Sequence, residues 1–138
     1  MLPALVAESQ ANDEELERLA LFQGEMVYRV DRIRRQGEQH SLESIRLPAA
    51  LFPSLQTPVP RISDLADTYG LQLGEALERV GAIAASPSIA KALGVADGTL
   101  VLTLDRVVHL RDGRPAEWRT TYCLDQGKLA RLKTGLGI

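Results

Sequence analysis

Apolar and polar residues alternate along four stretches of the chain, and this pattern predicts four β-strands. The stretches 27–34 and 100–110 are rich in Val, Ile and Leu, and each is followed by a turn sequence that contains glycine. Return strands are expected over 40–47 and 115–123, so that the four strands form two long antiparallel hairpins.

A short helix is predicted immediately before each hairpin. Asn12 precedes an acidic segment with helical spacing of its leucines, and Glu15 completes a pattern typical of a capping box. Ser86 is the equivalent N-cap in the second half, with Pro87 at the first helical position and Gly94 at the end. Each half of the chain is therefore expected to form a helix, a turn and a hairpin.

The two halves are copies of one pattern at an offset of 74 positions, which takes Gly24 onto Gly98. The same offset superposes Ala11 on Ala85, Leu19 on Leu93, Val27 on Val101, Asp31 and Arg32 on Asp105 and Arg106, and Glu43 on Glu117. Two copies are too few for a solenoid. The repeat therefore predicts one domain with pseudo-twofold symmetry.

The segment between the copies is less regular. Residues 62–69 predict one more short helix, with Gly70 just beyond its end. Residues 71–85 begin with a strand-like alternation and continue with a helical composition, so local propensity leaves both structures open.

The chain has 138 residues, of which 45% are hydrophobic and 25% charged, as is usual for one soluble globular domain. Its net charge of −2 and the lack of a long Lys/Arg run argue against nucleic-acid binding by this chain alone. The single cysteine, Cys123, excludes an internal disulfide framework and is typical of a reducing compartment. Neither a signal peptide nor a membrane span is indicated, and we expect a cytoplasmic protein.

The hairpin turns predict two pairs of opposite charges. If the first turn is centred between residues 37 and 38, Arg32 lies opposite Glu43. If the second is centred between residues 111 and 112, Arg106 lies opposite Glu117. The simplest interpretation is two cross-strand ion pairs that help to fix the register.

A difference between the copies suggests a binding site. Arg34 lies two residues beyond Arg32 and so shares its face of the strand, whereas the second copy has a valine there. The register places Arg34 opposite Ser41, which cannot neutralise it. Two guanidinium groups on a rigid strand suit bidentate recognition of a carboxylate or phosphate. The alternative is a solvated basic stripe that includes Arg29 and Arg35.

The sequence contains no familiar catalytic or metal-binding motif. It has two histidines and one cysteine without metal-ligand spacing, and it lacks a P-loop, a GxGxxG fingerprint and a GxSxG elbow. Cys123 could be a reactive thiol, His109 a general base and Trp118 a stacking platform. A structural role is the simpler interpretation of each. We therefore expect no catalytic residue, no metal and no cofactor.

Several stretches together resemble a known family. Residues 27–34 and 42–53, followed by 93–101 and 112–118, are similar to the UTRA domain, the effector-sensing domain of HutC-subfamily GntR-type transcription regulators. The resemblance extends over residues 11–125. It implies an α+β fold like that of chorismate lyase, with short helices packed on an antiparallel sheet to which 71–85 contributes a strand.

The resemblance also implies how such a domain works. Members act as homodimers, and they contact DNA through an N-terminal winged helix-turn-helix domain that residues 1–138 do not contain. The chain is therefore expected to be a single effector-binding domain, either excised from a regulator or acting without a DNA-reading module. The expected partner is a small anionic metabolite, either a phosphosugar or a carboxylate.

Site residues follow from the resemblance position by position. Members that sense sugar phosphates hold the ligand with two arginines on the first long strand, a glutamate on each return strand, and an aromatic residue near the second glutamate. Here a cysteine next to a tyrosine replaces that aromatic residue, and an arginine and a serine replace a serine and a tyrosine at the helix after the linker. These departures weigh against an amino-sugar phosphate. The expected ligand-binding residues are Arg32, Arg34, Glu43, Arg61, Ser63, Glu117, Tyr122 and Cys123.

Three functions are compatible with these features. The first is a sensor domain that binds an anionic effector and thereby alters DNA binding by an attached winged-helix domain. The second is an enzyme like chorismate lyase, which shares the implied fold. The third is a dimerisation module in which the arginines are merely solvated.

Overall fold

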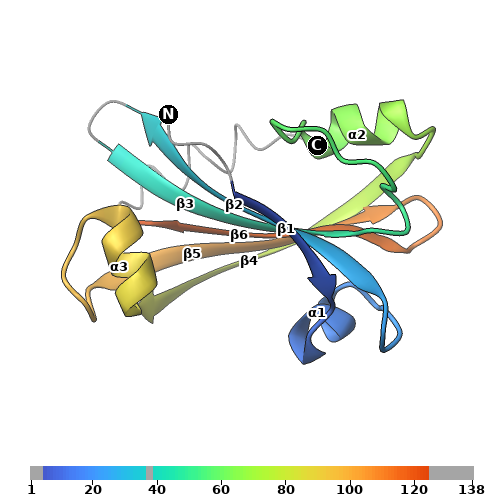
Figure 1. The fold of residues 1–138 in the computed structure, drawn as a ribbon. Helices are drawn as coiled ribbons and strands as arrows, with labels where there is room; N and C mark the ends of the chain where they lie inside the picture. The colour runs from blue at the N-terminus through green and yellow to red at the C-terminus, as the bar shows by residue number, and fades with distance from the viewer. Residues whose placement is uncertain (1–4, 37–38, 125–138) are drawn as a thin grey trace.

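A computed structural model describes residues 5–36 and 39–124, which form a six-stranded antiparallel sheet and three short helices (Figure 1). The strand order is β1-β2-β3-β6-β5-β4. In Figure 1, α2 lies on one side of the sheet, and α1 and α3 lie on the other. The expected α+β architecture is confirmed. The elements are β1 (Leu5–Gln10), α1 (Asp13–Arg18), β2 (Met26–Gln36), β3 (Gln39–Pro48), α2 (Ile62–Thr68), β4 (Leu73–Ala84), α3 (Pro87–Leu93), β5 (Leu100–Leu110) and β6 (Pro115–Cys123).

The internal repeat is structural. Each copy folds as strand, helix and hairpin, and the offset of the sequence repeat takes β2 onto β5 residue by residue. Equivalent hydrogen bonds close the two copies, because the N–H of Ala11 donates to Glu25 O and that of Ala85 to Thr99 O, each at 2.8 Å. The return strands β3 and β6 are neighbours in the middle of the sheet. The pseudo-twofold axis therefore passes between them.

The predicted helix caps are confirmed. The side chain of Asn12 accepts a hydrogen bond from the Glu15 N–H at 2.8 Å, and the Glu15 carboxylate accepts one from the Asn12 N–H at 2.9 Å. Ser86 caps α3, which ends at Gly94 in the left-handed conformation with φ 71°. The equivalent residue after α1 is Ala20, which adopts φ 51° although it carries a Cβ.

Two strands differ from what local sequence indicated. β1 was not predicted, because its six residues show no clear alternation. β4 is a strand despite its helical composition, as the family resemblance implied. A bulge between Leu73 and Ala76 starts this strand, and a Cβ on Gly74 would lie 2.9 Å from Leu110 O. Only glycine permits this close approach to β5 without a shift of the backbone.

The register of the first hairpin is as predicted, and that of the second is wrong. Arg32 lies opposite Glu43, but Arg106 lies opposite Arg119 rather than Glu117. The turn is centred on residue 112, which moves the pairing by one position, and an irregularity between Val108 and His109 moves it by one more. The two hairpins therefore do not carry matching cross-strand Arg–Glu pairs.

The largest apolar core lies between α2 and one end of the sheet. The remainder of that face, towards the far ends of β2, β3, β5 and β6, carries charged residues instead. Smaller cores lie under α1 and α3 and bury the repeat-related pairs Leu19 with Leu93 and Val27 with Val101. The main core consists of Val30, Ile45, Leu47, Phe52, Val59, Ile62, Leu65, Val108, Leu110 and Ala116. Among the described helices, none has the length and hydropathy needed to cross a membrane.

Candidate functional site

A cluster of arginines and glutamates occupies the charged part of the face that carries α2. Residues directly opposite one another on neighbouring strands share a face, so one row runs from Arg32 through Glu43 to Thr121. The adjacent row contains Arg119, Arg106 and Glu78 on β6, β5 and β4. We call the set Arg32, Arg34, Glu43, Arg106, Glu117 and Arg119 the arginine cluster.

Glu43 is the centre of this cluster. Its side chain is 1% exposed, and Oε1 lies 3.0 Å from Arg34 Nε and 3.4 Å from Arg32 Nε. Its second oxygen accepts a hydrogen bond from Arg119 Nη1 at 3.0 Å. One buried carboxylate thus holds three guanidinium groups, two from β2 and one from β6. Arg34 lies directly opposite Ser41, as predicted, but its charge is neutralised in part by Glu43, which is diagonally across from it on β3.

Arg119 links the two halves of the domain. Its Nη1 contacts Glu43 and its Nη2 donates to Glu117 Oε2 at 3.1 Å. Sequence reasoning missed this residue, because the assumed register placed Glu117 opposite Arg106. The signal was present as a charged residue two positions beyond Glu117, where strand alternation places both side chains on one face.

Arg106 extends the cluster to the edge of the sheet. Its Nε lies 3.7 Å from Glu78 Oε1 on β4. Burial lowers the pKa of Arg106 from its ordinary value, and the charges of Glu78 and Glu117 oppose that effect. The two rows together therefore place charged side chains on every strand from β2 to β4 on this face.

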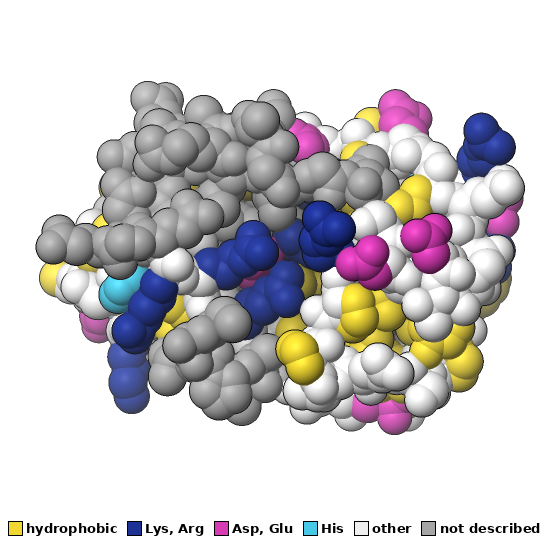
Figure 2. Space-filling view, turned by 90° about the horizontal axis from the view of Figure 1, so that it is seen from above, with side chains coloured by type: hydrophobic (Ala, Val, Ile, Leu, Met, Phe, Trp, Pro, Cys, Tyr) yellow, Lys and Arg dark blue, Asp and Glu magenta, His cyan; other side chains and the backbone are white. Residues whose placement is uncertain are grey.

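The arrangement leaves two guanidinium groups available to a ligand. Arg32 and Arg34 are 18% and 40% exposed, whereas the Arg119 side chain is 7% exposed. Both residues contact Glu43 through Nε. Figure 2 looks down on this face and shows Lys and Arg side chains gathered near its middle.

Buried polar atoms lie beneath these arginines. Ser41 and Thr121 are 0% and 1% exposed, and neither hydroxyl finds a hydrogen-bond partner in the part of the chain that the structure describes. Arg119 Nε is in the same situation. Buried groups of this kind cost free energy unless water or a ligand satisfies them.

Tyr122, Arg61 and Ser63 have other neighbours in the described structure. Tyr122 is opposite Leu42 on the other face of the sheet, where it packs in the core under α3 and burial raises its pKa. Arg61 is exposed and lies 3.5 Å from Asp64 in α2. Ser63 lines a separate hollow beside Gln72 and Arg111. Of the expected residues, Arg32, Arg34, Glu43 and Glu117 are linked by ion pairs that run through Arg119. Cys123 packs in a small core with Leu104.

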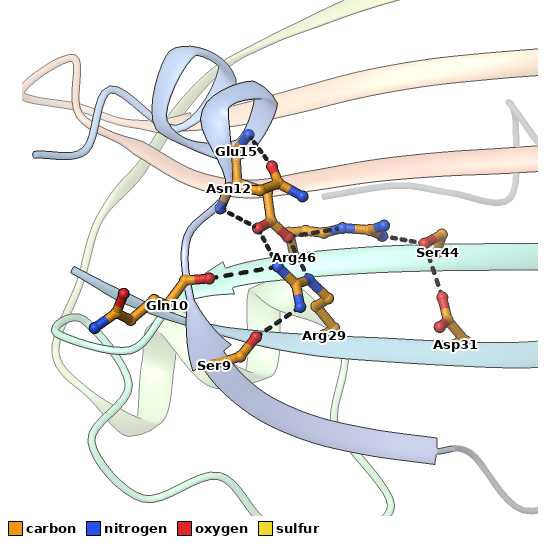
Figure 3. A network of polar contacts seen from close by, with 8 residues as sticks. All are labelled: Ser9, Gln10, Asn12, Glu15, Arg29, Asp31, Ser44 and Arg46. Carbon is orange, nitrogen blue, oxygen red and sulfur yellow. Dashed lines mark hydrogen bonds and ion pairs between the residues drawn. The ribbon is translucent and has the colours of Figure 1, made fainter. Parts of the chain in front are cut away.

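A second charged network lies on the opposite face, where it attaches α1 to the sheet (Figure 3). Glu15 is fully buried and accepts hydrogen bonds from Arg29 Nε at 2.7 Å and from Arg46 Nε at 3.1 Å. Burial alone would raise the pKa of Glu15. Hydrogen bonds from Arg29 and the Asn12 backbone, with the charges of Arg29 and Arg46, lower it overall. Arg29 is thus engaged in the structure and is not part of a solvated stripe.

Trp118 belongs to this second network, and its contacts there are with side chains of the domain itself. The guanidinium carbons of Arg18 and Arg46 lie 5.2 and 5.4 Å from its ring centroid, and its Nε1 donates to Asp105 at 3.1 Å. Within residues 5–36 and 39–124, no group of three or more His, Cys, Asp or Glu side chains is arranged to hold a metal ion.

Comparisons with known proteins agree with this architecture. The model of the UTRA domain family matches residues 5–126. The HTH-type transcriptional regulator Rv0792c of Mycobacterium tuberculosis is 32% identical over 93 residues, which cover 62% of this chain and 35% of the relative. The chain thus spans about a third of that relative's length.

Solved structures of GntR-family regulators have the same fold. The ligand-binding domain of such a regulator from Bordetella bronchiseptica superposes with a TM-score of 0.79 and 27% identity, covering 88% of this chain and 80% of that one. The effector domain of PhnF from Mycobacterium smegmatis gives a TM-score of 0.77 at 18% identity, covering 87% and 76%. At that lower identity the likeness shows the fold alone.

Proposed function

Since the chain belongs to the UTRA domain family, we propose that it is the effector-binding domain of a HutC-subfamily GntR-type regulator and that its ligand is a small anion. The observation that carries the proposal is the partly exposed pair Arg32 and Arg34, both held through Nε by the buried Glu43. Three arginines, Arg32, Arg34 and Arg119, surround two glutamates, Glu43 and Glu117, which leaves one excess positive charge. An anion would neutralise the excess charge.

The geometry also favours a particular kind of anion. The outer Nη atoms of the two arginines suit a carboxylate or phosphate that accepts two hydrogen bonds from each guanidinium. The buried hydroxyls of Ser41 and Thr121 would then contact a polar substituent next to the anionic group. A phosphosugar or a hydroxylated carboxylate has both features.

Binding would act on DNA indirectly. We propose that the domain works in the cytoplasm as a homodimer and is attached to a winged-helix domain outside this chain. A ligand changes DNA binding only if its affinity differs between two arrangements of the dimer. We propose sensing rather than catalysis, because the matched relatives named above are regulators of transcription. Release of a hydroxybenzoate from chorismate by the purified chain would overturn this part.

A thermal-shift screen tests the ligand proposal. The panel contains inorganic phosphate, glucose 6-phosphate, citrate and malate, each against the native chain and two variants. Arg34→Ala removes one ligand-binding guanidinium. Arg35→Ala is the matched control, because Arg35 is an exposed neighbour that points to the other face of the same strand.

At a concentration of about 100 Kd, a ligand stabilises the native chain by about 2.7 kcal/mol. For a domain of this size that corresponds to roughly 5–10 °C in Tm. The shift should be lost in Arg34→Ala and kept in Arg35→Ala. A shift that survives both Arg34→Ala and Arg32→Ala would place the ligand elsewhere. If no anion stabilises the native chain, the interpretation as a dimerisation module without ligand is favoured.

A further inference from the structure

A hollow of about 450 Å³ lies at the end of the sheet away from the arginine cluster. Three loops at that end form it (Figure 1): the α1–β2 loop, the turn after β3 and the β5–β6 turn. Its mostly apolar lining includes Leu21, Phe22, Glu25, Leu51 and Arg114. A hollow of this size, lined by apolar side chains with a few polar groups, is typical of a small-molecule site.

The loops around the hollow are held by their own hydrogen bonds. In the α1–β2 loop the Phe22 N–H donates to Glu25 Oε2 at 2.5 Å, and the Glu25 N–H donates to Phe22 O at 3.1 Å. In the β5–β6 turn the Gly113 N–H donates to Leu110 O at 2.9 Å. Because the loops are already ordered, a ligand would bind here at a small cost in conformational entropy.

The second copy of the repeat shows that the turn itself does not need Phe22 or Glu25. The offset of the repeat places Ala96 and Thr99 at these two positions. The Thr99 N–H donates to Ala96 O at 3.2 Å, which is the equivalent of the bond from Glu25 to Phe22. Phe22 is also 83% exposed, so it does not belong to the core. An aromatic ring and a carboxylate at these positions therefore indicate a role in binding.

The charge of the hollow favours a cation. Asp112 and Arg114 pair with each other at 2.8 Å within the β5–β6 turn. Glu25 is the remaining charged residue of the described lining, so two negative charges and one positive charge leave an excess of one negative charge. A carboxylate beside an aromatic ring suits an ammonium group, because both attract positive charge. The arginine cluster at the other end of the sheet has the opposite excess.

We propose that this hollow binds a small organic amine. The ammonium group lies close to Glu25 and the ring of Phe22, and the apolar body of the amine packs between Leu21 and Leu51. Contact with the ligand removes exposed ring surface of Phe22 from water, which contributes to affinity. The site is separate from the arginine cluster, and the inference holds whether or not an anion binds there.

Isothermal titration calorimetry of residues 1–138 with 2-phenylethylamine at neutral pH tests the proposal. 3-Phenylpropanoate carries the same ring with a negative charge, and 2-phenylethanol carries it without a charge. The amine should bind with a Kd of about 1 mM or below, as expected for a ligand of this size. Its affinity should exceed that of the alcohol about 10-fold, since it adds contacts of the ammonium group with a carboxylate and a ring.

Two variants install the residues of the second copy and should therefore keep the turn. Glu25→Thr should raise the Kd of the amine about 5-fold and leave that of the alcohol unchanged. Phe22→Ala should weaken the binding of both compounds, because both contact the ring. Leu100→Ala is the control, since Leu100 is 68% exposed and lies outside the hollow. It should change neither affinity.

Amide NMR shifts locate the bound amine independently of these variants. Signals of residues 20–25 and 112–115 should move on titration, while those of Arg32, Arg34 and Glu43 stay in place. Equal affinity for the amine, the alcohol and the carboxylate would contradict the preference for a cation. If neither 2-phenylethylamine nor the larger tryptamine binds at millimolar concentration, or if binding is unchanged in both Glu25→Thr and Phe22→Ala, the proposed site is wrong.

Discussion

Replacing Glu43 by glutamine removes the negative charge that holds three arginines while it keeps the size of the side chain. Arg32 and Arg34 are partly exposed and are able to turn towards solvent. Arg119 is 7% exposed and remains fixed between position 43 and Glu117. The glutamine amide would present either its NH2 group or its uncharged oxygen to the three arginines, and neither replaces the carboxylate as a hydrogen-bond acceptor.

The loss in the free energy of unfolding follows mainly from the buried ion pair between Glu43 and Arg119. Removing one partner of a buried ion pair typically costs about 3–5 kcal/mol. Because Arg119 keeps its contact with Glu117, we expect the lower end of that range, about 3 kcal/mol. The contact with Arg34 adds little, since ion pairs of partly exposed groups contribute below about 1 kcal/mol.

Urea unfolding followed by circular dichroism at pH 7 measures this loss. The midpoint should fall without a change in m, because both chains bury the same surface. Glu8→Gln is the control, since Glu8 is exposed on β1. It should stay within about 0.5 kcal/mol of the native chain.

The same variant gives a second readout. Without the Glu43 charge the cluster gains one unit of positive charge, so added phosphate should stabilise Glu43→Gln more than the native chain. A variant as stable as the native chain, with the same response to phosphate, would refute the view that Glu43 holds the arginines together.

Three further predictions concern other parts of the domain. Because the pKa of Glu15 is lowered from 4.5, its contribution to stability is present above that pH and lost as the pH falls. Glu15→Gln should therefore be less stable than the native chain at pH 7 and lose less between about pH 5 and 3 in pH-dependent urea melts. Ala20→Gly should raise the free energy of unfolding by about 0.5–1 kcal/mol, and Gly94→Ala, its repeat-related counterpart, should lower it by about 1 kcal/mol, because both positions have positive φ. Thr121→Val removes a buried hydroxyl without a described partner, so urea melts should show unchanged or slightly higher stability, while calorimetry should show weaker binding of the anion identified by thermal shift.

Much of the fold was predictable because local signals and long-range pairing agree in it. The caps at Asn12 and Ser86 and the turn glycines Gly24 and Gly98 fix helix starts and turns within a few residues of sequence. The first hairpin register placed Arg32 opposite Glu43 correctly, because its strands pair without interruption.

The remaining features depend on geometry that local sequence does not encode. The centre of the second turn and a bulge next to it each shift the pairing by one position, and together they bring Arg119 rather than Glu117 opposite Arg106. Strand alternation then separates Tyr122 from the arginine cluster, although it is adjacent to Cys123 in sequence. The helical composition of β4 is overridden by its long pairing with β5.

Side-chain NMR of the arginine Nε–Hε groups tests the central claim most directly. The isotope-labelled chain is titrated with the anion that stabilises it best in the thermal screen, and signals are assigned with single Arg→Lys variants. The account predicts saturable shifts of the Arg32 and Arg34 signals with one common Kd, while the signals of Arg18 and Arg29 on the other face stay in place. Saturable shifts confined to Arg18 and Arg29, with Arg32 and Arg34 unchanged, would contradict it.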